Sequence, residues 1–173
     1  MKVLISAFKN FNNASNNYSA EVLHYIHNVD KIILDVVYDK CYEQMNKVHN
    51  LGDYDLIISL GEARSRNSLM LEIQAINLAS CSIPDNAGIL IKDEKIIING
   101  KDILYTNVDV EKVKDIIEFS YDAGKYVCNN LYYYLLHYYP NKSIFIHIPN
   151  CYDSLYEYQK YAKIIENIIE RLR

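Results

Sequence analysis

The sequence has little glycine, no closely paired cysteines and no long apolar run, and each scarcity excludes something. Only five of its 173 residues are glycine, where average usage would give roughly twelve, so Asn and Asp must supply many turns. Its four cysteines contain no CxxC pair, which argues against a disulfide-stapled secreted fold and favours a reducing compartment. A zinc site could be drawn from His147, Cys151 and Cys128, but the second ligand pair of such sites is missing. We therefore expect no metal site.

Charge and hydropathy exclude two further classes of protein. The 18 Lys and Arg residues against 22 Asp and Glu give a net charge of -4, which does not suit a nucleic-acid partner. No run approaches the ~18 apolar residues of a membrane span, and the start MKVLISAFKNF lacks the long apolar segment of a signal peptide. These features predict no membrane partner and a cytoplasmic location. Half of the residues are hydrophobic, enough for a sizeable core.

Short apolar runs alternate with helical periodicity along the chain. The apolar runs predict buried strands at residues 2–6, 31–37, 55–60 and 143–148. Helical patterns begin near residues 19 and 153 and cover residues 39–49, 110–120 and 125–139. Residues 72–79 fit either a helix or a strand, and residues 89–100 look like a hairpin that turns at Asp93 and Glu94. This alternation predicts an α/β fold, a single domain over residues 1–173 built as an α/β/α sandwich around a mostly parallel twisted sheet.

Three residues could together form a thiol hydrolase, although each also has an ordinary structural explanation. His147 lies near a strand end, where open α/β sheets gather functional groups, but it could be a core histidine. Cys128 lies in the first turn of a helix, which can lower a thiol pKa, but it could be a small buried hydrophobe. Glu72 lies among apolar residues, where a buried carboxylate needs a partner such as an imidazole, but it could be an exposed acid. Together they would supply a nucleophile, a base and an orienting carboxylate.

Five blocks of sequence strengthen this interpretation. The opening AFKNFNNASNNYSAEVL fits the pattern G-F-x-P-F-G-G followed by N-P-S-x-E-V, and LGEARSRNSLMLEIQAIN fits L-G-Q-A-G-G-R-S followed by E-R-x-A-x-N. IPDNAG, AGKYVCN and FIHIP fit R-I-P-D-N-E-G, A-G-T-x-x-C-N and F-I-H-x-P. In these patterns and in their order, the chain resembles the pyroglutamyl peptidase I family, also called pyrrolidone-carboxylate peptidases. The resemblance spans nearly the whole chain.

The resemblance implies a cysteine peptidase that removes the N-terminal pyroglutamyl residue from blocked peptides through an acyl-enzyme. Cys128 would be the nucleophile, His147 the base and later the acid, and Glu72 the orienting carboxylate. No cofactor is implied. The family often assembles as tetramers, so the resemblance suggests a homo-oligomer of this chain.

The resemblance also implies how the acyl group would be bound. The rings of Phe8 and Phe11 would flank the flat lactam, because aromatic contact and a few hydrogen bonds can select a small uncharged ring. Asn17 and Glu62 would be further substrate contacts.

The chain departs from the family pattern around the expected ring pocket and oxyanion region. Glu62 stands where the family has Gln, Arg64 and Ser65 stand in place of two glycines, and Ser82 replaces an Arg. If Glu62 faces the lactam, Arg64 could neutralise its charge. These departures leave open a second hypothesis, a binding or scaffold protein of the same fold that keeps the triad with weak turnover or none.

Overall fold

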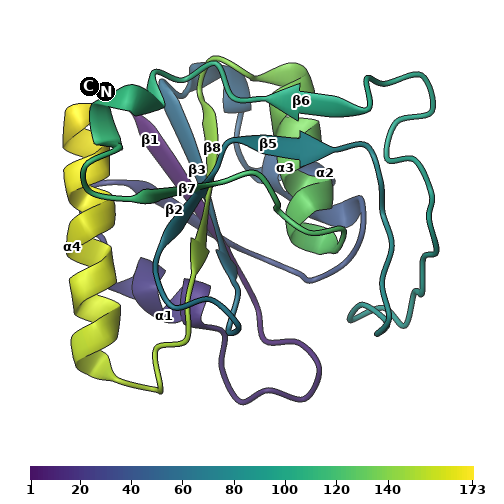
Figure 1. Cartoon of the computed structure of the whole chain (residues 1–173), viewed down its shortest axis with the longest axis horizontal. Helices are drawn as coiled ribbons and strands as arrows, with labels where there is room; N and C mark the ends of the chain where they lie inside the picture. The colour runs from purple at the N-terminus through teal and green to yellow at the C-terminus, as the bar shows by residue number, and fades with distance from the viewer.

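A six-stranded sheet forms the centre of the computed structural model, which describes residues 1–173 (Figure 1). In order across the sheet, its strands are β2 (Asp30–Leu34), β1 (Val3–Phe8), β3 (Leu56–Glu62), β8 (Ser143–Ile148), β4 (Met70–Glu72) and β7 (Glu118–Ser120). Every neighbouring pair is parallel except β4 with β8. The predicted mostly parallel sheet is thus confirmed.

The central strands are apolar because both faces of the sheet are covered. Every residue of β1 and β8 is buried, whereas the edge strand β2 exposes three of its five residues. A near-continuous hydrophobic run is what a strand buried on both faces requires. The four strands predicted from such runs are therefore present, with shifted ends for the first three and unchanged ends for β8.

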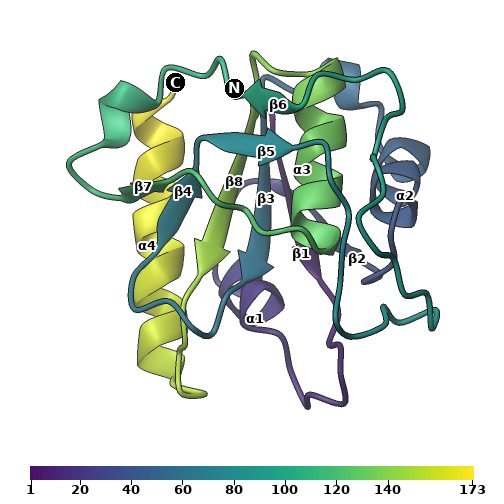
Figure 2. The ribbon, with the colours of Figure 1, turned by 45° about the vertical axis from the view of Figure 1, so that its right-hand side comes forward.

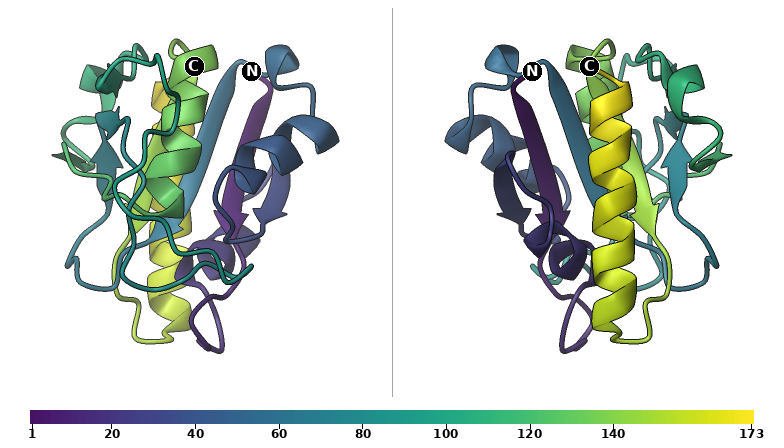
Figure 3. Two further views of the ribbon diagram at one scale, coloured as in Figure 1. Left: turned by 90° about the vertical axis from the view of Figure 1, so that its right-hand side faces the viewer. Right: turned by 90° about the vertical axis from the view of Figure 1, so that its left-hand side faces the viewer.

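Helices cover the two faces of the sheet in two layers (Figure 3). Helices α1 (Tyr18–His24) and α4 (Leu155–Arg171) share one core with Ile144, Ile146 and Ile148 of β8. Helices α2 (Lys40–Val48) and α3 (Val127–Tyr138) share the other with Phe145. This arrangement is the predicted α/β/α sandwich. None of these helices combines the length and apolar character needed to cross a lipid bilayer.

A small antiparallel pair, β5 (Gln74–Ile76) with β6 (Ile103–Tyr105), lies against α3 (Figure 2). It resolves the ambiguity over residues 72–79, because the chain ends β4 at Glu72 and enters β5 two residues later. Two 3₁₀ turns complete the secondary structure, at Leu51–Asp53 and Val110–Val113.

Two predicted elements are wrong. The helix predicted over residues 110–120 is only the 3₁₀ turn, followed by β7, because residues 118–120 form a parallel ladder with β4 that the local pattern does not reveal. The hairpin predicted over residues 89–100 does not form. Glu94 instead exchanges backbone hydrogen bonds of 2.7 and 2.9 Å with Ala79, since an isolated two-stranded hairpin is marginal in water and this pairing ties the segment to the rest of the molecule.

The two chain ends lie at the same end of the molecule, and β3 and β8 run away from it (Figure 2). Their carboxyl ends therefore meet at the opposite end, together with that of β1. Functional side chains in open α/β sheets gather at this edge.

Candidate active site

The candidate active site lies where β3 and β8 end, on the face of the sheet that α3 covers. His147 is the next-to-last residue of β8, and its register partner on β3 is Gly61. Alternation along β8 puts Phe145 on the same face as His147, with their ring centroids 4.9 Å apart. Only 5% of His147 is exposed, so its ring nitrogens need partners inside the protein.

Glu72 supplies one partner from the antiparallel strand β4. Its Oε1 lies 2.7 Å from His147 Nδ1, and the residue is completely buried. Glu72 is the register partner of Phe145, so its side chain is on the same face as His147 and one diagonal step away. Because a carboxylate only accepts hydrogen bonds, Nδ1 carries the proton and Nε2 is left as an acceptor. The imidazole is thereby held in the tautomer that a general base requires.

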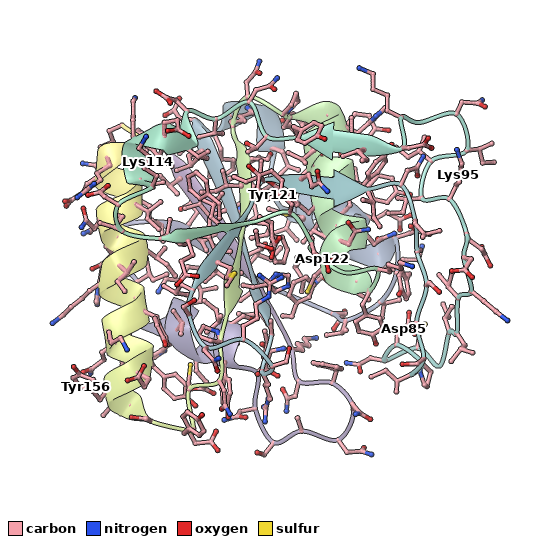
Figure 4. The ribbon with its side chains drawn as sticks, in the orientation of Figure 1. Asp85, Lys95, Lys114, Tyr121, Asp122 and Tyr156 are labelled. Carbon is pink, nitrogen blue, oxygen red and sulfur yellow. The ribbon has the colours of Figure 1, made fainter.

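Arg66 contacts the same carboxylate oxygen from the connection between β3 and β4. Its Nη2 forms an ion pair with Glu72 Oε1 at 2.9 Å and donates a hydrogen bond of 2.6 Å to the carbonyl oxygen of Asp122. Oε2 of Glu72 is buried and has no hydrogen-bond partner, so the carboxylate charge is balanced at Oε1. Asp122 lies on the connection from β7 to α3 (Figure 4). Arg66 thus joins the carboxylate to the segment that leads to Cys128.

Cys128 is the second residue of α3, as the sequence predicted. The N-cap residue, Tyr126, gives no side-chain cap, so the first-turn N–H groups lack a capping acceptor. The sulfur lies against Gly61, where an added Cβ would come within 2.8 Å of both Cys128 Sγ and the Phe145 ring. Because Gly61 is the register partner of His147, the sulfur and the imidazole lie on the same face of the sheet, over the neighbouring strands β3 and β8.

The surroundings of Cys128 raise the pKa of its thiol. Burial is the largest cause, and Cys41 and the carboxylates of Glu72 and Glu62 add to it. The expectation that the helix start lowers this pKa is therefore wrong for the free protein, because burial and negative neighbours outweigh the helix dipole. The thiol is protonated at neutral pH, so its attack on a substrate requires a base to accept the proton.

The other three cysteines are less suited to nucleophilic chemistry. All four are free, but Cys41 and Cys151 are fully buried, and their thiols donate hydrogen bonds to backbone carbonyl oxygens. Cys81 accepts a hydrogen bond from the Ile91 N–H at 3.3 Å.

The structure contains no group of three or more His, Cys, Asp or Glu side chains placed to hold a metal ion.

The two phenylalanines predicted to flank the substrate ring lie in different environments. Phe11 is partly exposed and helps to line a cavity of about 420 Å³, and its ring packs at a tilt against Tyr126 with the ring centroids 5.9 Å apart. The other lining residues are Asn10, Asn12, Asn13, Ala14, Pro84, Asp85 and Asn86. Phe8 is only 2% exposed and packs in the core beside α3. The structure therefore gives a cavity wall at Phe11 and a buried ring at Phe8.

Asn17 has a structural role that the motif did not indicate. As the N-cap of α1, its Oδ1 accepts hydrogen bonds from Ser19 N at 3.0 Å and from Ser19 Oγ at 2.7 Å. Its Nδ2 donates to the Lys9 carbonyl oxygen at 3.0 Å. These bonds occupy both of its polar atoms, and a contact of Asn17 with substrate stays a prediction.

Glu62, at the end of β3, is enclosed by two donors. Its Oε2 accepts from the Tyr18 N–H and its Oε1 from Arg64 Nε, both at 2.7 Å. Its side chain is only 5% exposed, and the Arg64 guanidinium also lies 4.3 Å from the centroid of the Tyr18 ring. Arg64 therefore compensates the charge of Glu62. Glu62 directly follows Gly61, against which the Cys128 sulfur lies, and its carboxylate adds to the raised pKa of that thiol.

Sequence reasoning assigned no role to two residues that the structure brings into the site, Gly61 and Arg66. Both match the family pattern, but a motif does not tell which neighbours a residue contacts. A lone glycine inside an apolar strand often marks a close approach of another group, and that signal was present at Gly61. For Arg66 no local signal exists, because Glu72 and Asp122 reach it only in the folded chain.

Comparison with known proteins shows the family of the chain. The family model described as pyroglutamyl peptidase matches residues 1–164. A pyrrolidone-carboxylate peptidase from Thermosipho melanesiensis is 29% identical over 91% of this chain and 87% of its own length. One from Brachyspira hyodysenteriae is 30% identical over 86% of this chain and 83% of its own length.

Solved structures give the same result. A mutant pyrrolidone carboxyl peptidase from the hyperthermophile Pyrococcus furiosus superposes with a TM-score of 0.86 at 25% identity, covering 99% of this chain and 98% of the other. The pyrrolidone carboxyl peptidase of Fervidobacterium islandicum has the same TM-score and coverage at 28% identity. The similarity thus extends over both helical layers and the whole sheet.

Proposed function

The chain belongs to the pyroglutamyl peptidase family, and from this premise we propose that it removes N-terminal pyroglutamyl groups from peptides through Cys128, His147 and Glu72. It is a cysteine hydrolase of that family. The observation that carries the assignment of the three residues is the 2.7 Å bond between Glu72 and His147. That bond leaves Nε2 free to accept a proton, and Cys128, a partly exposed cysteine at the start of α3, lies on the same face of the sheet.

In the acylation step, His147 Nε2 accepts the thiol proton as Cys128 Sγ attacks the carbonyl carbon that joins the lactam to the next residue. The first-turn N–H groups of α3 point to the position where negative charge develops on the carbonyl oxygen, and the helix dipole favours that charge. The C–N bond then breaks, and His147 returns its proton to the leaving amine. Glu72 stabilises the imidazolium throughout.

Deacylation repeats the same proton transfers with water. His147 accepts a proton from the water as its oxygen attacks the thioester carbonyl, and the C–S bond breaks. The proton returns from His147 to Cys128 Sγ, which regenerates the free thiol and releases pyroglutamate. The high pKa of the thiol in the free protein suits this cycle, because the sulfur needs the base at every turnover.

The acyl group binds on the Phe11 side of the site. The cavity at Phe11 contains the side chains of the Asn-rich loop after β1 and of the IPDN segment. Its amide groups and one aromatic wall suit a small, flat, uncharged ring. The partners are peptides blocked at the N-terminus by pyroglutamate, and a reducing cytoplasm keeps the four free thiols available. We also propose that copies of this chain assemble into a homo-oligomer.

Hydrolysis of a pyroglutamyl-arylamide by the purified chain tests the proposal. We expect turnover by the wild type, none above background for Cys128→Ala, and a fall of about 10⁴ in rate for Glu72→Gln, the cost of the same acid-to-amide change in a serine-type triad. The matched control is Cys81→Ala, which removes the other partly exposed thiol. Activity in Cys128→Ala, or full activity in Glu72→Gln, would contradict the assignment. No wild-type hydrolysis of any pyroglutamyl peptide would refute the function.

A further inference from the structure

Arg66 is the one charged group that contacts the Glu72–His147 pair and has no role in the mechanism proposed above. Its Nη2 lies 2.9 Å from the carboxylate oxygen that also binds His147, and 2.6 Å from the Asp122 carbonyl oxygen. The Arg66 side chain is 20% exposed and that of Glu72 is fully buried. A buried carboxylate whose second oxygen has no partner depends on those two donors for its ionised form.

We propose that Arg66 is a positioning residue with two roles, compensating the charge of Glu72 and tying Glu72 to the turn in front of Cys128. The proposal rests on the function proposed above for Cys128 and His147. The tie is direct, because a single Nη2 atom bridges β4 and the Asp122 turn. The chain from Asp122 to Cys128 contains Gly124, whose φ of +77° lies in the left-handed region and whose N–H donates to Asp122 Oδ1 at 2.9 Å. Arg66 therefore adds an anchor to the start of a turn that needs glycine.

The charge role follows from what surrounds the pair. The titratable and charged groups that face it are Arg66 from the β3–β4 connection and Cys128 and Tyr132 from α3. Arg66 is the cation among them. A positive charge next to Glu72 weakens the attraction of Glu72 for the imidazolium form of His147. Arg66 therefore limits the charge that Glu72 presents to His147, whose neutral imidazole is the form that acts as a base.

NMR titration of the His147 ring in the full-length protein tests the charge role. Because a cation within ~4–6 Å shifts a neighbouring titration by one unit or more, we expect the His147 midpoint in Arg66→Gln to rise by about one pH unit. Arg66→Lys keeps the charge and should hold the midpoint near the wild-type value. Arg64→Gln is the matched control, since Arg64 pairs with Glu62, and it should move the midpoint by much less.

The tie to Asp122 has a separate readout. A lysine ammonium cannot reproduce the planar geometry of the guanidinium, so Arg66→Lys should lower kcat for a pyroglutamyl-arylamide about tenfold while KM and the His147 midpoint stay near wild type. If Arg66 had only a general structural role, its substitution would not change kcat or the His147 midpoint one without the other. An unchanged His147 midpoint in Arg66→Gln, or full kcat in Arg66→Lys, would overturn the corresponding role.

A double-mutant cycle keeps the proposal testable if Arg66→Gln folds poorly. Removing Arg66 leaves the Glu72 charge buried and uncompensated, so its effect on the urea midpoint should largely disappear in a Glu72→Gln background. An equal effect in both backgrounds would refute the charge role. The titration and the cycle need no turnover, so a wild type that lacks peptidase activity but shows the expected His147 shifts would refute the proposed function and leave the role of Arg66 standing.

Discussion

Gly61 leaves the space that the sulfur of Cys128 occupies. On β3, directly beside His147, any side chain at this position would meet Cys128 Sγ and the Phe145 ring at 2.8 Å. Such a distance is shorter than atoms tolerate without moving, and the neighbours here are a packed ring and the Cys128 sulfur. A single missing Cβ therefore decides where the sulfur of Cys128 lies.

Gly61→Ala is expected to lower kcat/KM for a pyroglutamyl-arylamide by about 10² or more, since a 1 Å misplacement at a reacting centre costs that much. It should also destabilise the fold by about 1–3 kcal/mol through overpacking. The control is Gly52→Ala, where the added Cβ would meet only the Asn50 side chain, at 3.3 Å, and where activity should persist. Kinetics and urea unfolding of both variants check this, and wild-type kcat/KM in Gly61→Ala would mean that Sγ does not lie over Gly61.

Glu62→Gln is expected to raise kcat/KM for the same substrate by about tenfold, equal to one recovered hydrogen bond of ~1.4 kcal/mol in the transition state. Two reasons point the same way. A neutral amide can donate to a lactam oxygen that a carboxylate repels, and removing the charge of Glu62 lowers the pKa of the Cys128 thiol. Loss of the Arg64 pair costs little, because the Arg64 side chain is 43% exposed.

The matched control for Glu62→Gln is Arg64→Gln, which leaves the Glu62 carboxylate without its cation and should lower kcat/KM. Steady-state kinetics of both variants near neutral pH make the comparison. If Glu62→Gln lost activity instead, Glu62 would be a working substrate contact in its ionised form.

Among single residues, those predictable from sequence carry unusual chemistry at a position that local pattern locates. Cys128 at a helix start and His147 at a strand end are of this kind. Glu72 could be singled out by its apolar neighbours, but its bond to His147 depends on an antiparallel strand of three residues. The raised pKa of the Cys128 thiol was not predictable, because burial and the charges of Glu72 and Glu62 arise only when distant strands meet.

At the scale of elements, length separates what the sequence predicts from what it does not. The strands β1, β3 and β8 and the helices α3 and α4 are long enough to show their period and were expected near their observed bounds. β4, β5, β6 and β7 have three residues each, too few for alternation to be recognised. These short strands exist because of their ladders with neighbours, which explains why β7 was taken for part of a helix. One of them, β4, carries Glu72, so the least predictable kind of element positions part of the site.

Helix α1 provides an element-scale prediction. Asn17→Ala removes the cap of α1 and the bond to the Lys9 carbonyl, so the free energy of unfolding should fall by about 1–2 kcal/mol. KM for a pyroglutamyl-arylamide should stay near wild type if the role is structural. Asn50→Ala is the control, since Asn50 caps only the 3₁₀ turn at Leu51–Asp53 and is exposed; its effect should be smaller. Unchanged urea unfolding with a raised KM in Asn17→Ala would instead make Asn17 a substrate contact.

At the scale of the whole molecule, both helical layers pack on one shared sheet. The strands β3 and β8 contribute alternate residues to the two cores, so Ile146 packs toward α4 while His147 faces α3. The C-terminal helix α4 buries six residues against strands that come from both halves of the chain. Neither layer can separate without exposing the apolar face of the shared sheet, and we therefore expect residues 1–173 to unfold as one cooperative unit.

Tryptophan reporters test this cooperativity, because the chain has no tryptophan of its own. Tyr161→Trp in α4 reports on one layer, and Tyr134→Trp in α3 reports on the other. In each variant, the urea midpoint from tryptophan fluorescence should coincide with the midpoint from far-UV circular dichroism, because a two-state unit gives the same transition by every probe. Comparison within each variant removes any effect of the substitution on stability. If fluorescence in Tyr161→Trp changed at lower urea than the circular dichroism, α4 would detach first. Inactivation would then precede global unfolding, since loss of the α4 layer uncovers the face of β8 opposite to His147.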